Sequence, residues 1–220
     1  MEISFIGHAC FRLRGRDAAV IIDPYSKSIG LPTLVPSKFA SDVLVITHDH
    51  PGHNNRAMVG GNPKVVDSPG EYEVHGVGLH GVGAFHDDAE GQKLGPMTLF
   101  AIEIDEIVVA HLGDLAHPLS EAQQEQLGSI DVLLLPVGGG NGLAATQAAA
   151  VANQLDAKIV VPMHYNLPGL KQPLDDPTHF AAEMGIVTFE YQPKLSISGK
   201  PSNDDMKVVF LEARAASGSQ

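Results

Sequence analysis

The chain has 220 residues, of which 44% are hydrophobic, a formal net charge of −12 and a single cysteine, Cys10. This length and apolar content allow a sizeable core in one or two domains, and the acidic balance with scattered Lys and Arg argues against a nucleic-acid-binding surface. One cysteine excludes an intramolecular disulfide, and no apolar run is long enough for a membrane span or a signal peptide, so we expect a cytoplasmic protein.

The first half of the chain predicts a meander of short strands. Apolar or alternating runs bounded by turn residues predict strands at 2–7, 10–14, 18–23, 42–47 and 64–68. The segment 74–85 is rich in glycine but alternates, which predicts a pair of strands with tight turns. The segment 97–114 predicts a hairpin that turns around Asp105 and Glu106.

The second half alternates helices and strands. Ser120 as an N-cap and Gly128 as a stop predict a helix over 120–129, the Ala-rich run predicts one over 144–155, and Pro177 in a first turn predicts one over 176–185. Strands are predicted at 131–136, 157–165, 187–191, 194–198 and 207–213. Because no linker divides the chain, we predict one α/β domain over 1–213, with two sheets covered by helices and a flexible tail at 214–220.

Four of the predicted strands run into a histidine or an aspartate. These residues are His48, His86, Asp114 and His164. In layered α/β folds ligands gather beyond the carboxyl ends of strands, where the loops converge on a rigid frame. The pattern therefore predicts a functional site at one edge of the sheets.

The segment THDHPGH has the residue types and spacing of a metal site. His48 and His50 are two residues apart in an extended segment, so they point the same way and can bind one ion together. His53 lies in a turning segment, faces elsewhere and could reach a second ion. Imidazole suits Zn, Fe, Mn or Ni, and a carboxylate can bridge two ions. Two metals about 3.5–4 Å apart hold a hydroxide at neutral pH and clamp the attacking and leaving oxygens.

These motifs resemble those of the metallo-β-lactamase fold superfamily, and most of all its compact bacterial branch of Zn-dependent hydrolases, which includes L-ascorbate-6-phosphate lactonase-like proteins. The likeness covers nearly the whole chain and rests on GHACFRL, VIIDP, THDHPGH, PGEYEV, FHDD, HLGDLAHPL, DVLLLPVGG and VPMHY, in the family's order and spacing. It implies a four-layer αββα sandwich of two mixed sheets, with the metal site along the open edge between them. It also implies metal-dependent hydrolysis.

The resemblance also implies roles for individual residues. The first metal would be held by His48, His50 and His86, the second by His53 and His164, with Asp114 bridging the two and Asp114 and His53 as catalytic residues. The family has an aspartate immediately before the third histidine of the motif, where this chain has Gly52. That departure leaves open whether two metals, one or none are bound.

Four further residues are predicted around the ligands. A water, Asp49 or Asp23 could fill the place of the missing carboxylate, and Asp23 could orient a ligand histidine or simply initiate a turn. The resemblance places His8 near the mouth of the site, where it could equally be a packed residue. Tyr165 could donate a hydrogen bond to substrate or pack in the core.

The function that follows is hydrolysis of a small, anionic ester, lactone or phosphoester by a metal-bound hydroxide, with one or two Zn ions and with Mn or Fe as alternatives. The alternative is a non-catalytic metal- or ligand-binding member of the same fold with a degenerate second site. Redox chemistry at a di-iron site fits less well, because no flavin domain is evident. We expect a small-molecule substrate, no nucleic-acid or membrane partner, and, on the resemblance alone, a homo-oligomer.

Overall fold

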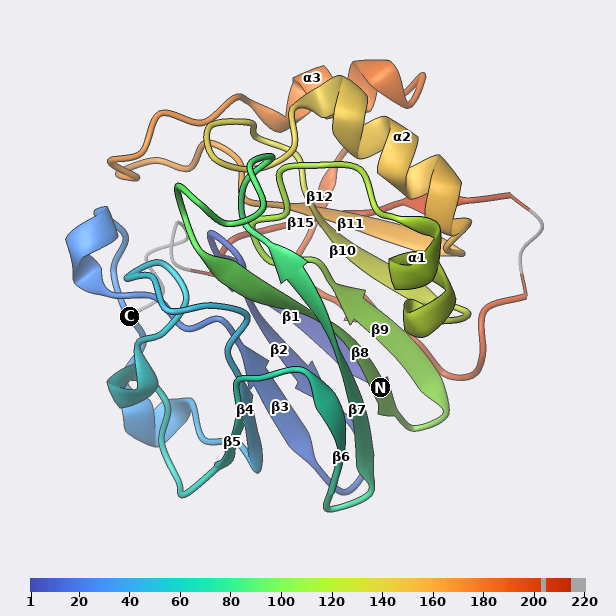
Figure 1. The fold of residues 1–220 in the computed structure, drawn as a ribbon. Coiled ribbons are helices and arrows are strands. Elements are labelled where there is room, and N and C mark those ends of the chain that lie inside the picture. The colour runs from blue at the N-terminus through green and yellow to red at the C-terminus, as the bar shows by residue number, and fades with distance from the viewer. Residues whose placement is uncertain (203–204, 215–220) are drawn as a thin grey trace.

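Two β-sheets lie face to face in the computed structural model, which describes residues 1–202 and 205–214 (Figure 1). The tail predicted at 214–220 lies outside the described residues except for Arg214.

The six-stranded sheet is built mainly from the N-terminal meander. Its strands, in spatial order, are β13 (Leu195–Ser196), β1 (Glu2–Gly7), β2 (Cys10–Arg14), β3 (Ala19–Ile22), β4 (Val43–Val45) and β5 (Lys64–Val66). The strands β1 to β3 are antiparallel, and β3 to β5 are parallel. The continuous apolar runs of β3 and β4 are buried throughout, as is typical of parallel strands covered on both faces. The five strands predicted in this region are confirmed.

The seven-stranded sheet holds most of the second half of the chain. Its order is β14 (Lys207–Val208), β11 (Ile159–Met163), β10 (Val132–Pro136), β9 (Ile107–His111), β8 (Pro96–Ile104), β7 (Val77–Phe85) and β6 (Gly70–Val74). The strands β6 to β9 form an antiparallel meander, and β9, β10, β11 and β14 are parallel. The predicted hairpin turn is confirmed, with Asp105 and Glu106 at φ +53° and +68° between β8 and β9.

The strand pair predicted within 74–85 is wrong. One strand, β7, runs unbroken from Val77 to Phe85, and it pairs with β6 through a turn at His75 and Gly76. The glycines that suggest turns lie inside the strand instead. A Cβ on Gly81 would come within 2.8 Å of the Ser68 carbonyl oxygen, so this glycine marks a close backbone approach.

Three predicted C-terminal strands are also shorter than expected. The strand predicted at 194–198 is reduced to β13 (Leu195–Ser196). From 187–191 only Tyr191 is in a strand, β12 (Tyr191–Gln192). The run 207–213 divides at Val209 into β14 and β15 (Phe210–Leu211), because the chain there leaves the large sheet to pair with β12 in a separate two-stranded sheet.

Three α-helices appear in the described part of the chain, and all three were predicted. They are α1 (Glu121–Leu127), α2 (Ala145–Leu155) and α3 (Pro177–Glu183), and α2 and α3 lie together outside the seven-stranded sheet (Figure 1). Ser120 and Gln123 form a capping box at the start of α1. Short 3₁₀ helices at Lys27–Ile29, Pro36–Lys38 and Arg56–Met58 follow β3 and β4. The fold class is confirmed as an α/β sandwich of two mixed sheets. None of the helices in residues 1–202 and 205–214 combines the length and apolar character needed to cross a bilayer.

Backbone hydrogen bonds between the two sheets position one edge of the sandwich. The N–H of Thr98 in β8 donates to the carbonyl of Thr47 after β4 (2.8 Å), and the N–H of His164 after β11 donates to the carbonyl of His8 in the β1–β2 turn (2.8 Å). The carboxyl ends of β4, β7, β9 and β11 therefore meet at this edge.

Candidate metal centre

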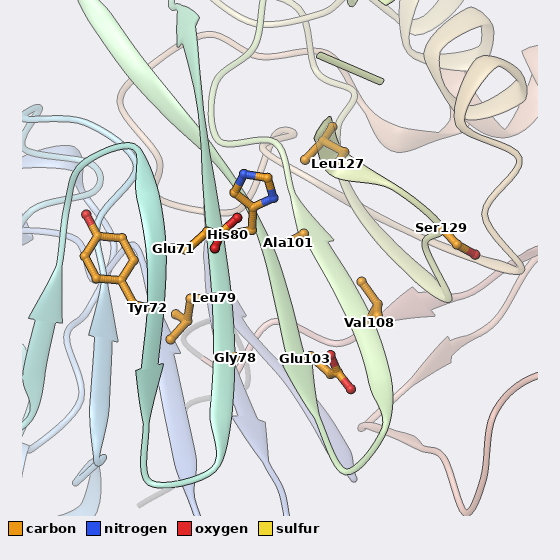
Figure 2. Close-up of a pocket in the computed structure, with 10 residues that line it drawn as sticks. All are labelled: Glu71, Tyr72, Gly78, Leu79, His80, Ala101, Glu103, Val108, Leu127 and Ser129. Atoms are coloured by element: carbon orange, nitrogen blue, oxygen red, sulfur yellow. The ribbon is translucent and has the colours of Figure 1, made fainter. Parts of the chain in front are cut away.

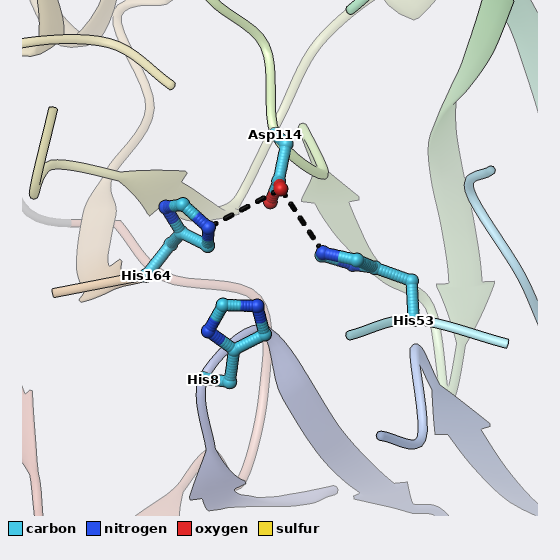
Figure 3. A group of neighbouring side chains, drawn as sticks. All are labelled: His8, His53, Asp114 and His164. Atoms are coloured by element: carbon cyan, nitrogen blue, oxygen red, sulfur yellow. Dashed lines mark hydrogen bonds and ion pairs between the residues drawn. The ribbon is translucent and has the colours of Figure 1, made fainter. Parts of the chain in front are cut away.

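Six predicted ligands and His8 converge at this edge in two groups. The first group is His48, His50 and His86, and the second group is His8, His53, Asp114 and His164; within each group the potential ligand atoms lie within 4.8 Å of one another. Asp114 lies between the groups. Its Oδ2 is 3.0 Å from His53 Nε2 and 3.2 Å from His164 Nε2 (Figure 3). The same oxygen is 3.5 Å from His86 Nε2.

The two groups differ in their access to solvent. All four members of the second group are buried, as are His48 and His86. Only His50 is partly exposed. The approach from solvent therefore lies on the side of the first group.

A short hydrogen-bond chain sets the ring of His48. The hydroxyl of Thr47 donates to Asp23 Oδ2 (2.7 Å), and the same oxygen lies 2.9 Å from His48 Nδ1. Because the only hydroxyl hydrogen is used on Asp23, the Thr47 oxygen must accept from His48 Nδ1–H. The Nε2 of His48 is then left with a lone pair, as a metal ligand requires.

The same carboxylate sets the ring of His53. Asp23 Oδ2 lies 2.8 Å from His53 Nδ1, and Asp23 Oδ1 accepts the backbone N–H of Thr47 (2.8 Å). With its Nδ1 proton held by Asp23, His53 turns the Nε2 lone pair towards Asp114 Oδ2, 3.0 Å away. The Nε2 lone pair of His53 and a lone pair of the Asp114 carboxylate can face each other at this distance only with a positive centre between them. That centre is either a proton or a metal ion.

Electrostatics agree with this geometry. Burial alone would lower the pKa of His53, but the carboxylates of Asp114 and Asp23 raise it to about 10. Burial opposes ionisation of Asp114, yet the neighbouring His164 and His53 lower its pKa well below the ordinary value. Burial, with His53 beside it, lowers the pKa of His48 to about 2. Asp114 is therefore a carboxylate and His48 a neutral imidazole, the forms in which both bind metals.

The residues present fit a metal centre because three of their ligand atoms have no hydrogen-bond partner in the described part of the chain. Among the described residues, His48 Nε2, His164 Nε2 and Asp114 Oδ1 are buried without a hydrogen-bond partner. Nearly all buried polar atoms in folded proteins are hydrogen-bonded, and leaving one unpaired costs about 1–3 kcal/mol. Three such atoms side by side indicate that the site is built to hold cations.

His111 supports the centre through a hydrogen bond at each of its two ring nitrogens. Its Nε2–H donates to the carbonyl of Ala9 (2.8 Å), so its Nδ1 accepts the N–H of Gly113 (3.1 Å). It thereby connects the turn that carries His8 to the turn that carries Asp114. Its place at the end of β9, two residues before the Gly-Asp pair, is the only signal in the sequence.

The loop after His86 is organised by Asp87. Its carboxylate accepts four backbone N–H groups, from Ala89, Gly91, Lys93 and Leu94, at 2.6–3.1 Å. The N–H of His86 donates to the carbonyl of Gly95, which closes the same loop (3.1 Å). Asp87 thus fixes the start of the loop on which His86 lies.

Of the four residues predicted around the ligands, two belong to the centre and two do not. Asp23 contacts His53, and His8 joins the second group. Asp49 is exposed, accepts a hydrogen bond from Asn54 and is not a member of either ligand group. Tyr165 is buried 5.8 Å (ring centroids) from Phe5, with its hydroxyl 3.5 Å from the Leu211 carbonyl, so it packs in the core.

A separate hollow lies on the outer face of β6 to β9. It has a volume of about 400 Å³, and Glu71, Glu103 and His80 are among the residues that line it (Figure 2). None of the residues of the two metal groups lines it. It is therefore not part of the metal centre.

Comparisons with known proteins agree with this fold and site. Residues 2–164 match the family model of the β-lactamase superfamily domain. A metal-dependent hydrolase of the UPF0173 group from Methanoculleus marisnigri is 30% identical over 200 residues, covering 80% of this chain and 86% of the relative. The corresponding protein of Thermococcus onnurineus is 29% identical over 191 residues, covering 76% and 85%.

Solved structures extend the likeness to nearly the whole chain. A Thermotoga maritima protein, named as a Zn-dependent hydrolase of the metallo-β-lactamase superfamily, is 35% identical with a TM-score of 0.77, covering 96% of this chain and 99% of that one. Igni18, a metallo hydrolase of Ignicoccus hospitalis, has a TM-score of 0.67 at 22% identity, covering 90% and 99%, and shows the fold alone. The narrower lactonase-like branch stays a prediction. The chain belongs to the metallo-β-lactamase superfamily.

Proposed function

We propose that this protein is a metal-dependent hydrolase that uses Zn and acts on a small, anionic ester, lactone or phosphoester. The observation that carries the proposal is the convergence of buried, unpaired ligand atoms on His48, His164 and Asp114. The names of the relatives support the reaction type, since several are called metal-dependent hydrolases. A cytoplasmic location belongs to the same proposal, because the only cysteine is a free, buried thiol.

The chain's own groups divide the work. His48, His50 and His86 would hold one ion, and His53 and His164 would hold a second, with Asp114 shared between them. When bound, the metal supplies Lewis-acid stabilisation and lowers the pKa of water towards neutrality. Oδ2 of Asp114 lies 3.0 Å from His53 Nε2 and 3.2 Å from His164 Nε2, whereas Oδ1 has no hydrogen-bond partner among the described residues. We assign to Oδ1 the proton that the attacking water loses.

The charge of the site favours an anionic substrate. Asp114 is the only carboxylate in the two groups, and the remaining members are histidines. Divalent ions would therefore leave the centre positively charged within an otherwise acidic chain of net charge −12. A small anion suits this combination better than a polyanion, which the acidic surface would repel.

The test is hydrolysis by protein purified without a chelating tag and loaded with zinc. A panel of lactones and aryl phosphoesters would be assayed with wild type, His86→Ala and the control His179→Ala, which changes an exposed histidine on α3. We expect His86→Ala to lose activity by about 100-fold or more and His179→Ala to keep it. Full zinc occupancy without hydrolysis of any panel member would instead favour the non-catalytic alternative.

A further inference from the structure

The place that the missing carboxylate would occupy is filled by another side chain. A Cβ built on Gly52 would come within 2.7 Å of His8 Nε2 and 3.1 Å of His8 Cδ2. Real Cβ atoms do not approach that closely, so a side chain at 52 and the ring of His8 compete for one space. The backbone of Gly52 does not have a positive φ, so its conformation does not require glycine. Glycine is required at this position because the ring of His8 takes the space that a side chain would need.

His8 enters the centre from the six-stranded sheet, the sheet that also carries Gly52 and His53 after β4. It lies in the β1–β2 turn with φ +56°, a conformation that non-glycine residues seldom adopt. Its carbonyl accepts the backbone N–H of His164, and its ring lies 4.5 Å from the ring of His164 and 5.1 Å from that of His53. Figure 3 shows the ring pointing between these two histidines towards Asp114.

Packing alone does not explain this ring. His8 is 2% exposed, and its Nδ1 is buried without a hydrogen-bond partner among the described residues. A histidine retained only for packing would be expected to satisfy its buried nitrogens. Its ligand atom lies within 4.8 Å of those of His53, Asp114 and His164.

We propose that His8 replaces the ligand that Gly52 cannot supply, so that His8, His53, His164 and Asp114 together hold the second metal ion. This inference rests on the proposed function only in taking the centre to bind metal. The exchange gives a donor set of three imidazoles and one carboxylate, which favours Zn over oxygen-preferring ions such as Mn.

The experiment exchanges the two ligands reciprocally. His8→Asn removes the imidazole while keeping a residue that tolerates the left-handed conformation, and His8→Asn/Gly52→Asp adds the carboxylate into the space thus freed. The matched control is His75→Asn, an exposed turn histidine at φ +51° outside the site. The readouts are zinc per chain by elemental analysis, zinc affinity by chelator competition, and the visible spectrum of the cobalt-substituted protein.

We expect two zinc ions in wild type and in His75→Asn, a second ion weakened by about 100-fold or more in His8→Asn, and its recovery in the double variant. Two ions at wild-type affinity in His8→Asn would overturn the inference, as would one ion in wild type or failure of the double variant to recover the second. If His8→Asn does not fold, His8→Gly takes its place in the same comparison. Two bound ions without hydrolysis would remove the proposed function and leave this assignment standing, whereas no bound zinc in wild type would remove both.

Discussion

Asp23→Asn would test the hydrogen-bond chain that sets the ligand histidines. Asp23 accepts from the N–H and the hydroxyl of Thr47 and lies 2.8 Å from His53 Nδ1. An asparagine oxygen can keep the bond to the Thr47 N–H, but its NH₂ group then faces two donors. His53 can relieve that conflict only by moving its proton to Nε2, the nitrogen that must be unprotonated to bind a metal.

The expected effect follows from these contacts. Loss of a partner that orients a ligand histidine should weaken the second zinc by about 10–100-fold, or about 1.4–2.8 kcal/mol. One buried donor left unpaired should lower the free energy of unfolding of the metal-free protein by about 1–3 kcal/mol. For a chain of this length that corresponds to a fall in Tm of about 2–12 °C.

Zinc affinity would be measured by competition with a chromophoric chelator, and the His53 tautomer by ¹⁵N NMR. The control is Asp131→Asn, a buried carboxylate that accepts the Val108 N–H (2.9 Å) at the amino end of β10, away from the site. It should lose stability and keep both zinc affinities. Wild-type affinity for both ions in Asp23→Asn, with His53 still protonated on Nδ1, would refute the reasoning.

Three other expectations concern the metal and its surroundings. Free zinc at about 100 times its Kd should raise the free energy of unfolding by about 2.7 kcal/mol and Tm by about 5–11 °C, because the unfolded chain does not bring the histidines together. Identical thermal unfolding curves with zinc and with EDTA would contradict this expectation. Asp87→Ala should weaken zinc binding at the first group, because four backbone N–H groups lose their acceptor beside His86. The measurement is zinc content after dialysis, and unchanged content and affinity would contradict the expectation. Tyr165→Phe should keep both ions and the hydrolysis rate and lose at most about 0.5–1.5 kcal/mol of stability, because the hydroxyl lies at the long distance of 3.5 Å from the Leu211 carbonyl. A slower rate with zinc retained would instead indicate that Tyr165 contacts the substrate.

Much of the fold could be predicted because local patterns and tertiary structure agree. The apolar runs of β3, β4, β10 and β11 are buried, and helices begin where expected, after the N-cap Ser120 and at Pro177 in a first turn. The prediction failed where tertiary context decides. Gly81 resembles a turn residue in the sequence but serves a close backbone approach within β7, and Val209 separates two strands because the chain changes sheet there.

The candidate site was predictable to the extent that ligands follow strands directly. The six predicted ligands converge because each comes at or shortly after the end of a strand, and strands aligned in sheets bring their ends together. The position of His8 next to Gly52 could not be foreseen, because the two residues are 44 positions apart and meet only when β1, β2 and β4 assemble into the six-stranded sheet. The side-chain direction of Asp49 could not be predicted for a similar reason. Its neighbours in sequence enter the site, but its own side chain turns to Asn54.

Backbone conformation separates the two groups further. His8, Asp23 and His164 have φ of +56°, +47° and +51°, and each such residue costs about 1–2 kcal/mol relative to the right-handed region. Glycine would relieve that cost at any of the three positions, but it would remove a side chain that contacts the second group. No residue of the first group is in this conformation. The strain and the unpaired atoms of His164 and Asp114 therefore concentrate around the second group, where a bound cation would offset both. On this reasoning the turns that carry His8 and His164 should gain the most hydrogen-exchange protection when zinc binds, and the strand ends that carry His48 and His86 should gain less.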